Sequence, residues 1–471
     1  MGNQQKDILY LRRNSEMYRR LYFTGIFAYV VMLVLSLLFY KERSILLDSS
    51  FDLFYLLKDG GFDINVVRFS GVLSKVAPVL AIRAGLPLNE VLLCYSFGYA
   101  AYYFLCYFIC GTILKKYDFA LVILLCNILF VAETFYYIPS ELPQGIAFAL
   151  VVFAFVGGRN INSALGWVAL TVLCIVCAFF HPLLLFVIAY TFVFFLLQKD
   201  RYFDVKQLSA ITILFFVFVA LKTVFIKAPY EQHAMGGLKN FVTQFPNYFT
   251  LYSDKLFLYN CITKYYWIPI FAVTIITLYR TNREWRKLAF FVLSVAGYLF
   301  LVNVCYPTKA TPTFYIENLY LPIGVFLALP LVFDVLPFLE KKRLAFPVFV
   351  LILLTGCVRL YATHSVFTER LNLERDVIAK YNNKKVVIGS ENVDADLLQM
   401  LWGTPYEFLL LGESENNKAA SIIIDDKPRL REPACYITNA LVVNWNVFPY
   451  CDLPTKYFHF TDTTSGYVIV P

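Results

Sequence analysis

Long apolar runs alternate with short polar breaks from residue 21 to residue 360. Because about 20 apolar residues in a helix cross the hydrocarbon core of a membrane, these runs predict transmembrane helices. We expect about eleven of them, several shorter than that core. They fall at residues 21–40, 91–114, 120–135, 144–156, 164–180, 183–197, 208–225, 267–279, 288–304, 315–333 and 346–360.

Residues 41–86 interrupt this pattern, since they are too polar for a span and too apolar for a free loop. Apolar residues recur at helical spacing over residues 50–58, which predicts a short helix lying on the membrane surface and ended by Gly60-Gly61. This first loop carries four carboxylates: Asp48, Asp52, Asp59 and Asp63.

The second half of this loop is basic. A helix from Asp63 onward would place Arg68, Gly71 and Lys75 on one face. A charged side chain at the bilayer centre costs roughly 3 kcal/mol on insertion scales, so we expect residues 66–84 not to cross the membrane as a straight helix. If they crossed, every later loop would change sides.

The chain changes character near residue 362. Residues 368–381 have the charge pattern of a helix, and residues 395–411 also have a helical pattern, with a break near 403–405. Residues 384–388 and 421–424 have the pattern of buried strands. We therefore expect two domains. A transmembrane domain covers residues 1–361, and a small α/β domain, the tail domain, covers residues 362–471.

Composition excludes a soluble protein with a single anchor. The chain is 59% hydrophobic and 16% charged, against about 25% charged residues in soluble proteins. The net charge of +8 does not indicate nucleic-acid binding, because the basic residues lie in short loops between spans.

Charge also sets the expected orientation. Arginines precede the first span, and Lys115-Lys116 and Lys341-Lys342-Arg343 follow later ones. The positive-inside rule puts these segments in the cytoplasm. We expect a multi-pass protein of the bacterial cytoplasmic (inner) membrane with its N-terminus inside and its tail domain outside.

Most of the eleven cysteines lie within apolar runs and are expected to be small buried hydrophobes. Cys435 and Cys451 are the only two in the tail domain. Outside the cytoplasm they would either form a disulfide or remain unpaired, and the sequence favours neither. No spacing typical of a zinc site is present.

The predicted outer face collects carboxylates, cations and aromatic side chains, a combination that suits a sugar carried on a lipid phosphate. As general base we rank Asp52 first, Asp48 second and Glu141 third. The candidates for phosphate contact are Arg68, Lys75, Lys222 and Lys309, and those for substrate contact are Glu133, His181 and Tyr137. The long outer loop 226–265 adds further polar residues, among them Tyr230 and His233.

These features resemble the GT-C superfamily of polytopic glycosyltransferases. Phe51-Asp52-Leu53-Phe54-Tyr55, a glycine pair, Arg68, Pro78 and Gly85 follow one another much as in bacterial aminoarabinose transferases and protein O-mannosyltransferases. Two later segments, Pro143-Gln144-Gly145-Ile146-Ala147 and Phe180-His181-Pro182, resemble EpsG-type polysaccharide polymerases. Pro143 stands where those polymerases usually have an arginine.

The resemblance implies an all-α, GT-C-like membrane domain and transfer of a sugar from a polyprenyl-phosphate or polyprenyl-diphosphate donor. The acceptor would be a glycan, a lipid or a protein at the outer face, and the partners would be membrane lipids but no nucleic acid. A carboxylate would act as general base, and cations would stabilise the departing phosphate. The resemblance also admits a divalent metal, Mg or Mn, with ligands unknown.

Two alternatives belong to other classes. A transporter or flippase for a lipid-linked or anionic solute would use broken helices around a site at mid-membrane. An acyltransferase would use His181.

Overall fold

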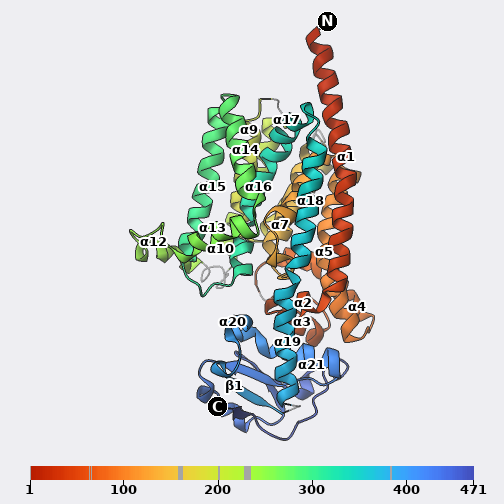
Figure 1. Ribbon diagram of the computed structural model, residues 1–471. Coiled ribbons are helices and arrows are strands. Elements are labelled where there is room, and N and C mark those ends of the chain that lie inside the picture. The colour runs from red at the N-terminus through yellow and green to blue at the C-terminus, as the bar shows by residue number, and fades with distance from the viewer. Residues whose placement is uncertain are drawn as a thin grey trace.

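The computed structural model of the protein is a long helical bundle that carries a small strand-containing domain at one end (Figure 1). The structure describes residues 2–62, 64, 66–157, 163–199, 202–226, 235–381 and 384–470, with side chains from residue 15 onward. Asp63, Tyr230 and His233 lie outside the described residues.

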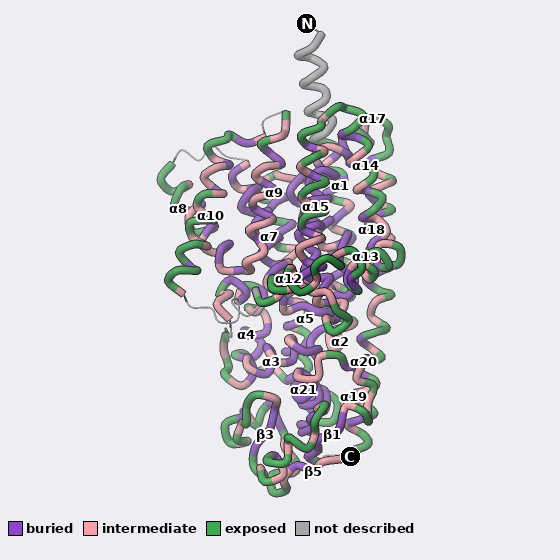
Figure 2. Tube along the Cα trace, turned by 90° about the vertical axis from the view of Figure 1, so that its left-hand side faces the viewer, coloured by how far each residue is buried: buried purple, intermediate pink, exposed green. Residues whose placement is uncertain are grey.

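The bundle consists of helices that run up and down between its two ends (Figures 1 and 2). The long or central helices are α1 (Gly2–Leu38), α5 (Leu88–Phe108), α6 (Tyr117–Leu129), α7 (Glu141–Gly157), α8 (Ala164–Ala178), α9 (Leu184–Leu196), α10 (Val205–Phe225), α14 (Trp267–Thr281), α15 (Trp285–Cys305), α16 (Thr313–Pro330), α17 (Leu336–Lys341) and α18 (Ala345–Ala362). The π-helical turns η2 (Ile109–Ile113) and η5 (Leu331–Val335) extend α5 and α16.

Each predicted span lies on one of these helices, yet their lengths differ. Six helices within the described part of the chain are long and apolar enough to cross a membrane, or seven if a pair bent by 90° is one span. The helices α6, α7, α8 and α9 are apolar but have only 13–17 residues. At 1.5 Å per residue they reach roughly 20–25 Å, less than the core of a bilayer. The polytopic helical fold is confirmed, and the number of eleven crossings stays a prediction.

The bent pair is α13 (Tyr252–Thr263) followed by α14. Before it, η4 (Met235–Lys239) and α12 (Asn240–Thr243) project sideways from the bundle (Figure 1). Apolar side chains on this arm are exposed, including Val242, Phe245 and Phe249. The predicted outer loop 226–265 therefore contains short helices.

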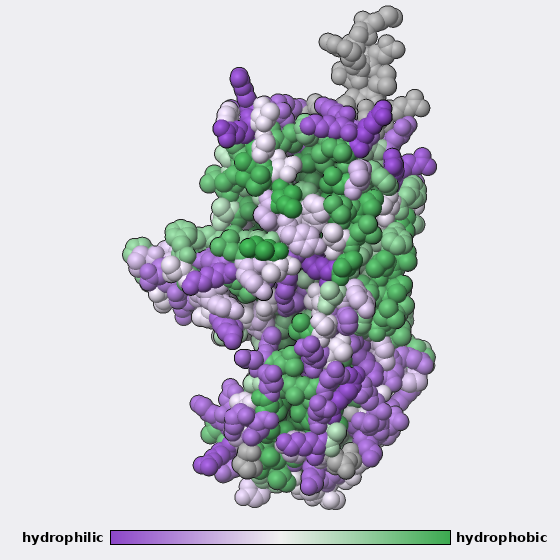
Figure 3. All heavy atoms as spheres, in the orientation of Figure 1, coloured by the Kyte–Doolittle hydropathy of each residue, from purple (hydrophilic) through white to green (hydrophobic). Residues whose placement is uncertain are grey.

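The two ends of the bundle differ. The N-terminus and α17 lie toward one end, and the tail domain lies at the other (Figure 1). Hydrophobic residues cover much of the bundle, whereas hydrophilic residues gather over the tail domain (Figure 3). The basic segment after α17 thus lies away from the tail domain, as the predicted orientation requires, while the side of the membrane that each end faces stays a prediction.

The first loop after α1 folds into α2 (Tyr40–Ser44), α3 (Asp48–Asp59), the 3₁₀-helix η1 (Phe69–Lys75) and α4 (Val76–Arg83). Gly60, with φ 63°, ends α3 as predicted. The expectation that residues 66–84 do not form one straight crossing helix is confirmed, because α4 has only 8 residues.

Two expectations for this loop were wrong. The helix α3 does not lie against lipid, because Leu53, Phe54 and Leu57 are buried in a core shared with the tail domain. The segment with Arg68 and Lys75 is not an α-helix, because Arg68 precedes η1 and the tighter 3₁₀ turn rotates Lys75 off the predicted face.

The tail domain has the predicted α/β character. Its elements are α19 (His364–Tyr381), β1 (Val386–Gly389), η6 (Ser390–Asn392), α20 (Ala395–Leu398), η7 (Leu401–Gly403), α21 (Thr404–Asn416), β2 (Ile422–Asp425), η8 (Pro428–Tyr436), β3 (Ala440–Val442), β4 (Val447–Pro449), η9 (Tyr450–Asp452) and β5 (Val468–Val470).

A parallel sheet in the order β2-β1-β5 forms the centre of this domain, and β3 and β4 form a separate antiparallel pair. The strands β1 and β2 are buried, as runs of Val and Ile in a parallel sheet require. Cys435 and Cys451 are both unpaired.

Candidate functional site

Two carboxylates lie on the first two turns of α3. Asp48 is the first residue of the helix and Asp52 lies one turn later, so both project from one face. Asp48 is half-buried, whereas Asp52 is only 6% exposed. A carboxylate at a helix N-terminus also faces the positive end of the helix dipole. Both residues were candidate general bases in the sequence analysis, and the structure places them on one face of the same helix.

Asp52 is held from two directions. Lys75, the last residue of η1, forms an ion pair with Oδ1 of Asp52. The hydroxyl of Tyr95, on α5, donates to Oδ2 of Asp52 at 2.9 Å. The predicted phosphate-binding Lys75 therefore lies beside the predicted base, and Tyr95 is a partner that sequence reasoning missed.

Asp48 contacts a different part of the bundle. The hydroxyl of Tyr137, in the segment between α6 and α7, donates to Oδ2 of Asp48. Burial raises the pKa of Asp48 to about 6, the Tyr137 hydrogen bond opposes this increase, and the nearby charges of Glu141 and Asp52 add to it. A carboxyl group in this range exchanges a proton near neutral pH.

A second ion pair lies next to the first. Nη1 of Arg68 donates to Oε2 of Glu141 at 2.8 Å, and both side chains are largely buried. Glu141 begins α7, and Gly71 allows η1 to approach it, because a Cβ at Gly71 would lie 3.0 Å from Cγ of Glu141. The third candidate base is thus paired with a candidate phosphate ligand.

His181 and Lys222 lie near Arg68. His181 follows α8, and its Nδ1 accepts the N–H of Leu183 at 3.1 Å. Burial, with the charges of Arg68 and Lys222, lowers the pKa of His181 well below its usual value. Lys222 is buried near the ring of Phe179, with Nζ 5.6 Å from the ring centroid. Neutral His181 therefore lies near two cations.

Two predicted residues lie elsewhere. Glu133 forms an ion pair with Lys264 at the bend between α13 and α14. Lys309 is exposed, and its nearest acidic partner is Asp396 of α20, at 3.8 Å. Neither residue has a recorded contact with Asp48 or Asp52.

Glu317, on α16, supports the segment that contains Glu133 and Tyr137. Its Oε1 accepts the N–H groups of Ala132 and Thr134, each at 2.8 Å. The hydroxyl of Tyr265 donates to its Oε2 at 2.6 Å. The buried carboxylate of Glu317 thus accepts backbone N–H groups that have no helical partner after α6 ends.

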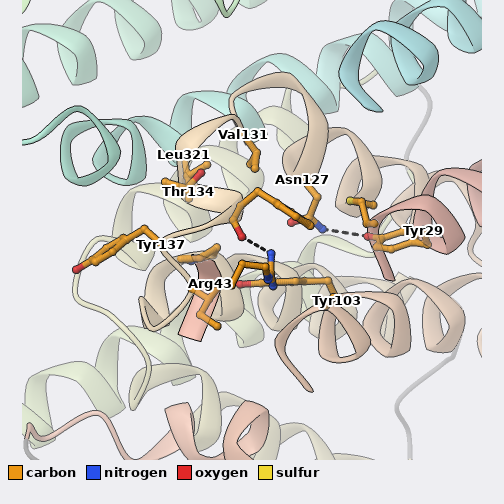
Figure 4. Close-up of a pocket in the computed structure, with 13 residues that line it drawn as sticks. Tyr29, Arg43, Tyr103, Asn127, Val131, Thr134, Tyr137 and Leu321 are labelled. Carbon is orange, nitrogen blue, oxygen red and sulfur yellow. Dashed lines mark hydrogen bonds between the residues drawn. The ribbon is translucent and has the colours of Figure 1, made fainter. Parts of the chain in front are cut away.

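Arg43 is a further residue that sequence reasoning missed. It is buried on α2, where its Nε donates to Oγ of Ser96 at 2.8 Å. Its Nη1 donates to the carbonyl of Phe135 (Figure 4). Because Phe135 precedes Tyr137 by two residues, Arg43 fixes the turn that presents Tyr137 to Asp48. A charged residue just after the first span was the only signal in the sequence.

Arg43 and Tyr137 also line a cavity of about 40 Å³, together with Tyr103 and Asn127 (Figure 4). This volume holds about three water molecules. The cavity lies behind Tyr137, on the bundle side of the site.

The tail domain reaches the site from the opposite side. The N–H of Leu47, the residue before Asp48, donates to Oε1 of Glu407 on α21. Glu407 is fully buried and accepts from Arg370 of α19 at 2.7–3.0 Å. Leu47 has φ 43°, an uncommon conformation for a branched residue. Gly403 makes room for it, because a Cβ at Gly403 would lie 2.9 Å from Cα of Leu47.

The expected divalent metal has no assigned ligands. Among the residues that the structure describes, no group of three or more His, Cys, Asp or Glu side chains is placed to hold one. Asp52 and Glu141 already face Lys75 and Arg68. The divalent metal stays a prediction.

No protein-family model, curated protein or solved structure matches the chain. The resemblance to the GT-C superfamily therefore stays a prediction based on short residue runs and the plan of the chain.

Proposed function

We propose that the protein is a GT-C-like glycosyltransferase that moves a sugar from a polyprenyl-phosphate or polyprenyl-diphosphate donor to an acceptor at the outer face of the membrane. The observation that carries this proposal is the meeting of Asp48 and Asp52 with Lys75 and Arg68 at the junction of bundle and tail domain. A carboxylate that accepts a proton and cations that stabilise a phosphate are the two requirements of the reaction.

Asp48 suits the role of general base better than Asp52. Both oxygens of Asp52 already accept from Lys75 and Tyr95, and the side chain is nearly buried. Asp48 is more accessible, and its pKa of about 6 allows it to take a proton at neutral pH. Asp52 would then hold Lys75 in position.

The step follows from these roles. The acceptor hydroxyl gives its proton to Asp48, and its oxygen attacks the anomeric carbon of the donor. The bond between that carbon and the phosphate oxygen breaks, and its electron pair remains on the phosphate. Arg68, Lys75 and Lys222 stabilise the resulting negative charge, while neutral His181 adds no competing charge.

A transporter is the second candidate, and a different observation favours it. The chain leaves helical geometry between α6 and α7, where η3 (Glu133–Phe135) lies beside the cavity that Arg43 and Tyr137 line. Broken helices around a cavity are typical of transporters. The cavity of about 40 Å³ is, however, too small for a sugar.

Vesicles containing the purified protein and radiolabelled undecaprenyl-phosphate sugars test the proposal. Asp48→Asn should lower the release of undecaprenyl phosphate by a factor of about 10² to 10⁴, because a positioned base contributes that much. Binding of undecaprenyl phosphate alone, measured by native mass spectrometry, should not change.

Asp59→Asn is the matched control, since Asp59 ends the same helix and pairs only with its neighbour Lys58 among the contacts described. If Asp48→Asn releases undecaprenyl phosphate at the normal rate, the proposed base is wrong. Labelled lipid that changes leaflet without losing its sugar would support the transporter instead.

A further inference from the structure

A row of aromatic side chains leads away from the carboxylates of α3. Phe51 lies between Asp48 and Asp52 in the sequence and faces the tail domain, where its ring meets Trp402 of η7 at 5.9 Å between centroids. The ring of Trp402 then meets that of Trp445, which lies between β3 and β4, at 5.0 Å and 31°. We call Phe51, Trp402 and Trp445 the aromatic row.

The outer part of this row is open to solvent. Trp445 is 64% exposed, and Trp402 and Phe51 are half-buried. The chain has only five tryptophans, and these two are the ones in the tail domain. Neighbouring large apolar side chains left at the surface of a hydrophilic domain commonly mark a binding site.

Polar groups border the row. Nδ2 of Asn446 donates to the hydroxyl of Tyr55, on α3, at 3.3 Å. Asn444, the residue before Trp445, accepts at Oδ1 from Nη2 of Arg431 at 2.6 Å. Amide and hydroxyl groups of this kind exchange hydrogen bonds readily with sugar hydroxyls.

We propose that the aromatic row binds the sugar rings of a saccharide acceptor and leads its end toward Asp48. The negative face of an indole ring attracts the C–H groups on the apolar side of a pyranose, and the polar border binds its hydroxyls. The inference rests on the proposed function, because it identifies the acceptor of that reaction as a glycan.

Other occupants fit less well. A stable protein partner needs about 800 Å² on each side, whereas the row offers a few rings with polar groups on both flanks. Lipid tails would need a continuous apolar surface, whereas the polar residues Asn444 and Asn446 flank Trp445 in the chain. Phe51, where the row begins, follows Asp48 by three residues and precedes Asp52 by one, so the row starts within one helical turn of both carboxylates.

Binding to a glycan array tests the row without any donor. The purified full-length protein in detergent is applied to arrayed chito-oligosaccharides, malto-oligosaccharides and bacterial polysaccharide fragments. We expect at least one saccharide to be bound, Trp445→Ala to weaken this binding at least tenfold, and Trp445→Phe to restore part of it. Tyr436→Ala should have no effect, because Tyr436 is a still more exposed aromatic of the same domain outside the row.

The outcomes separate the two proposals. If no saccharide is bound, or if Trp445→Ala binds as the unchanged protein does while its thermal stability is normal, the aromatic row is not a saccharide site. If the row binds a saccharide that the protein never glycosylates from any undecaprenyl-linked donor, the row stands and the transferase is wrong.

Discussion

Asp48 and Asp52 have nearly the same sequence context and different surroundings. Burial and neighbouring carboxylates raise the pKa of Asp48, whereas Lys75 and Tyr95 occupy Asp52. The sequence analysis chose both residues and ranked Asp52 first. The local sequence does not show which of the two carboxylates will pair with Lys75 of η1. The assignment of roles depends on contacts between distant segments.

The pKa of Asp48 predicts how activity depends on pH. A base must be ionised, so kcat/KM should rise with pH through about 6 and level off above it. Tyr137→Phe removes a hydrogen bond that favours the ionised form, so the rise should move to higher pH. A pH–rate profile of both proteins checks this, and a flat profile between pH 5 and 8 would contradict it.

The raised pKa of Asp48 also affects stability, which should increase as the pH falls, whereas activity should decrease. The folded protein binds the proton of Asp48 more tightly than the unfolded chain, whose carboxyl keeps the ordinary pKa of 3.8. The contribution of this group to the free energy of unfolding therefore increases as pH falls from about 6 toward about 4. Asp48→Asn should remove that part of the pH dependence from thermal unfolding curves.

At the scale of elements, α3 is the piece that both domains share. Its bundle side carries Asp52 toward Lys75, and its tail side packs Phe54 against Tyr406 of α21. The bond between Leu47 and Glu407 joins residues 360 positions apart. Through it, the tail domain fixes the residue that precedes the proposed base.

Weakening this bond should loosen the start of α3. In Glu407→Gln, we expect faster hydrogen exchange in peptides covering residues 45–52 and a lower kcat with little change in KM. Gly403→Ala should act in the same direction without removing a charge, because its Cβ would press on Leu47.

The control for this prediction is Asp425→Asn, which breaks an ion pair with Arg431 in the same domain, 2.7 Å long, that does not touch α3. If Asp425→Asn increases exchange over residues 45–52 as much as Glu407→Gln does, general loosening of the tail domain is the cause.

Local patterns predicted α3, the end of α3 at Gly60, the strands β1 and β2, and the break before α21. They did not predict where α3 packs. An apolar face at helical spacing fits a lipid surface and a protein surface equally well, and α21, which decides between them, is synthesised hundreds of residues later. Arg43 was missed for the same reason, since its partners Ser96 and Phe135 lie on other segments.

At the scale of the whole molecule, the site lies between two bodies at the end opposite the N-terminus. The proposed function requires that end to be extracytoplasmic. A reporter enzyme active only outside the cytoplasm should work when it is fused within the tail domain and fail when it is fused after Lys116. The reverse result would place Asp48 in the cytoplasm and remove the outer active site.

The shared position of α3 also has a consequence for how the protein is made. At about 5–20 residues per second, Glu407 is synthesised on the order of 20–70 s after Leu47, across the 360 residues that separate them. During that interval the side of α3 that packs against the tail domain lacks this partner, and an amphipathic helix with an open apolar side binds a membrane surface. We therefore expect α3 of the nascent chain to rest on the membrane surface, as its sequence pattern predicts, until α21 is made. A chain whose synthesis stops before α21 would carry both carboxylates on a helix still held by lipid, and a truncated copy in the membrane would be inactive for that reason.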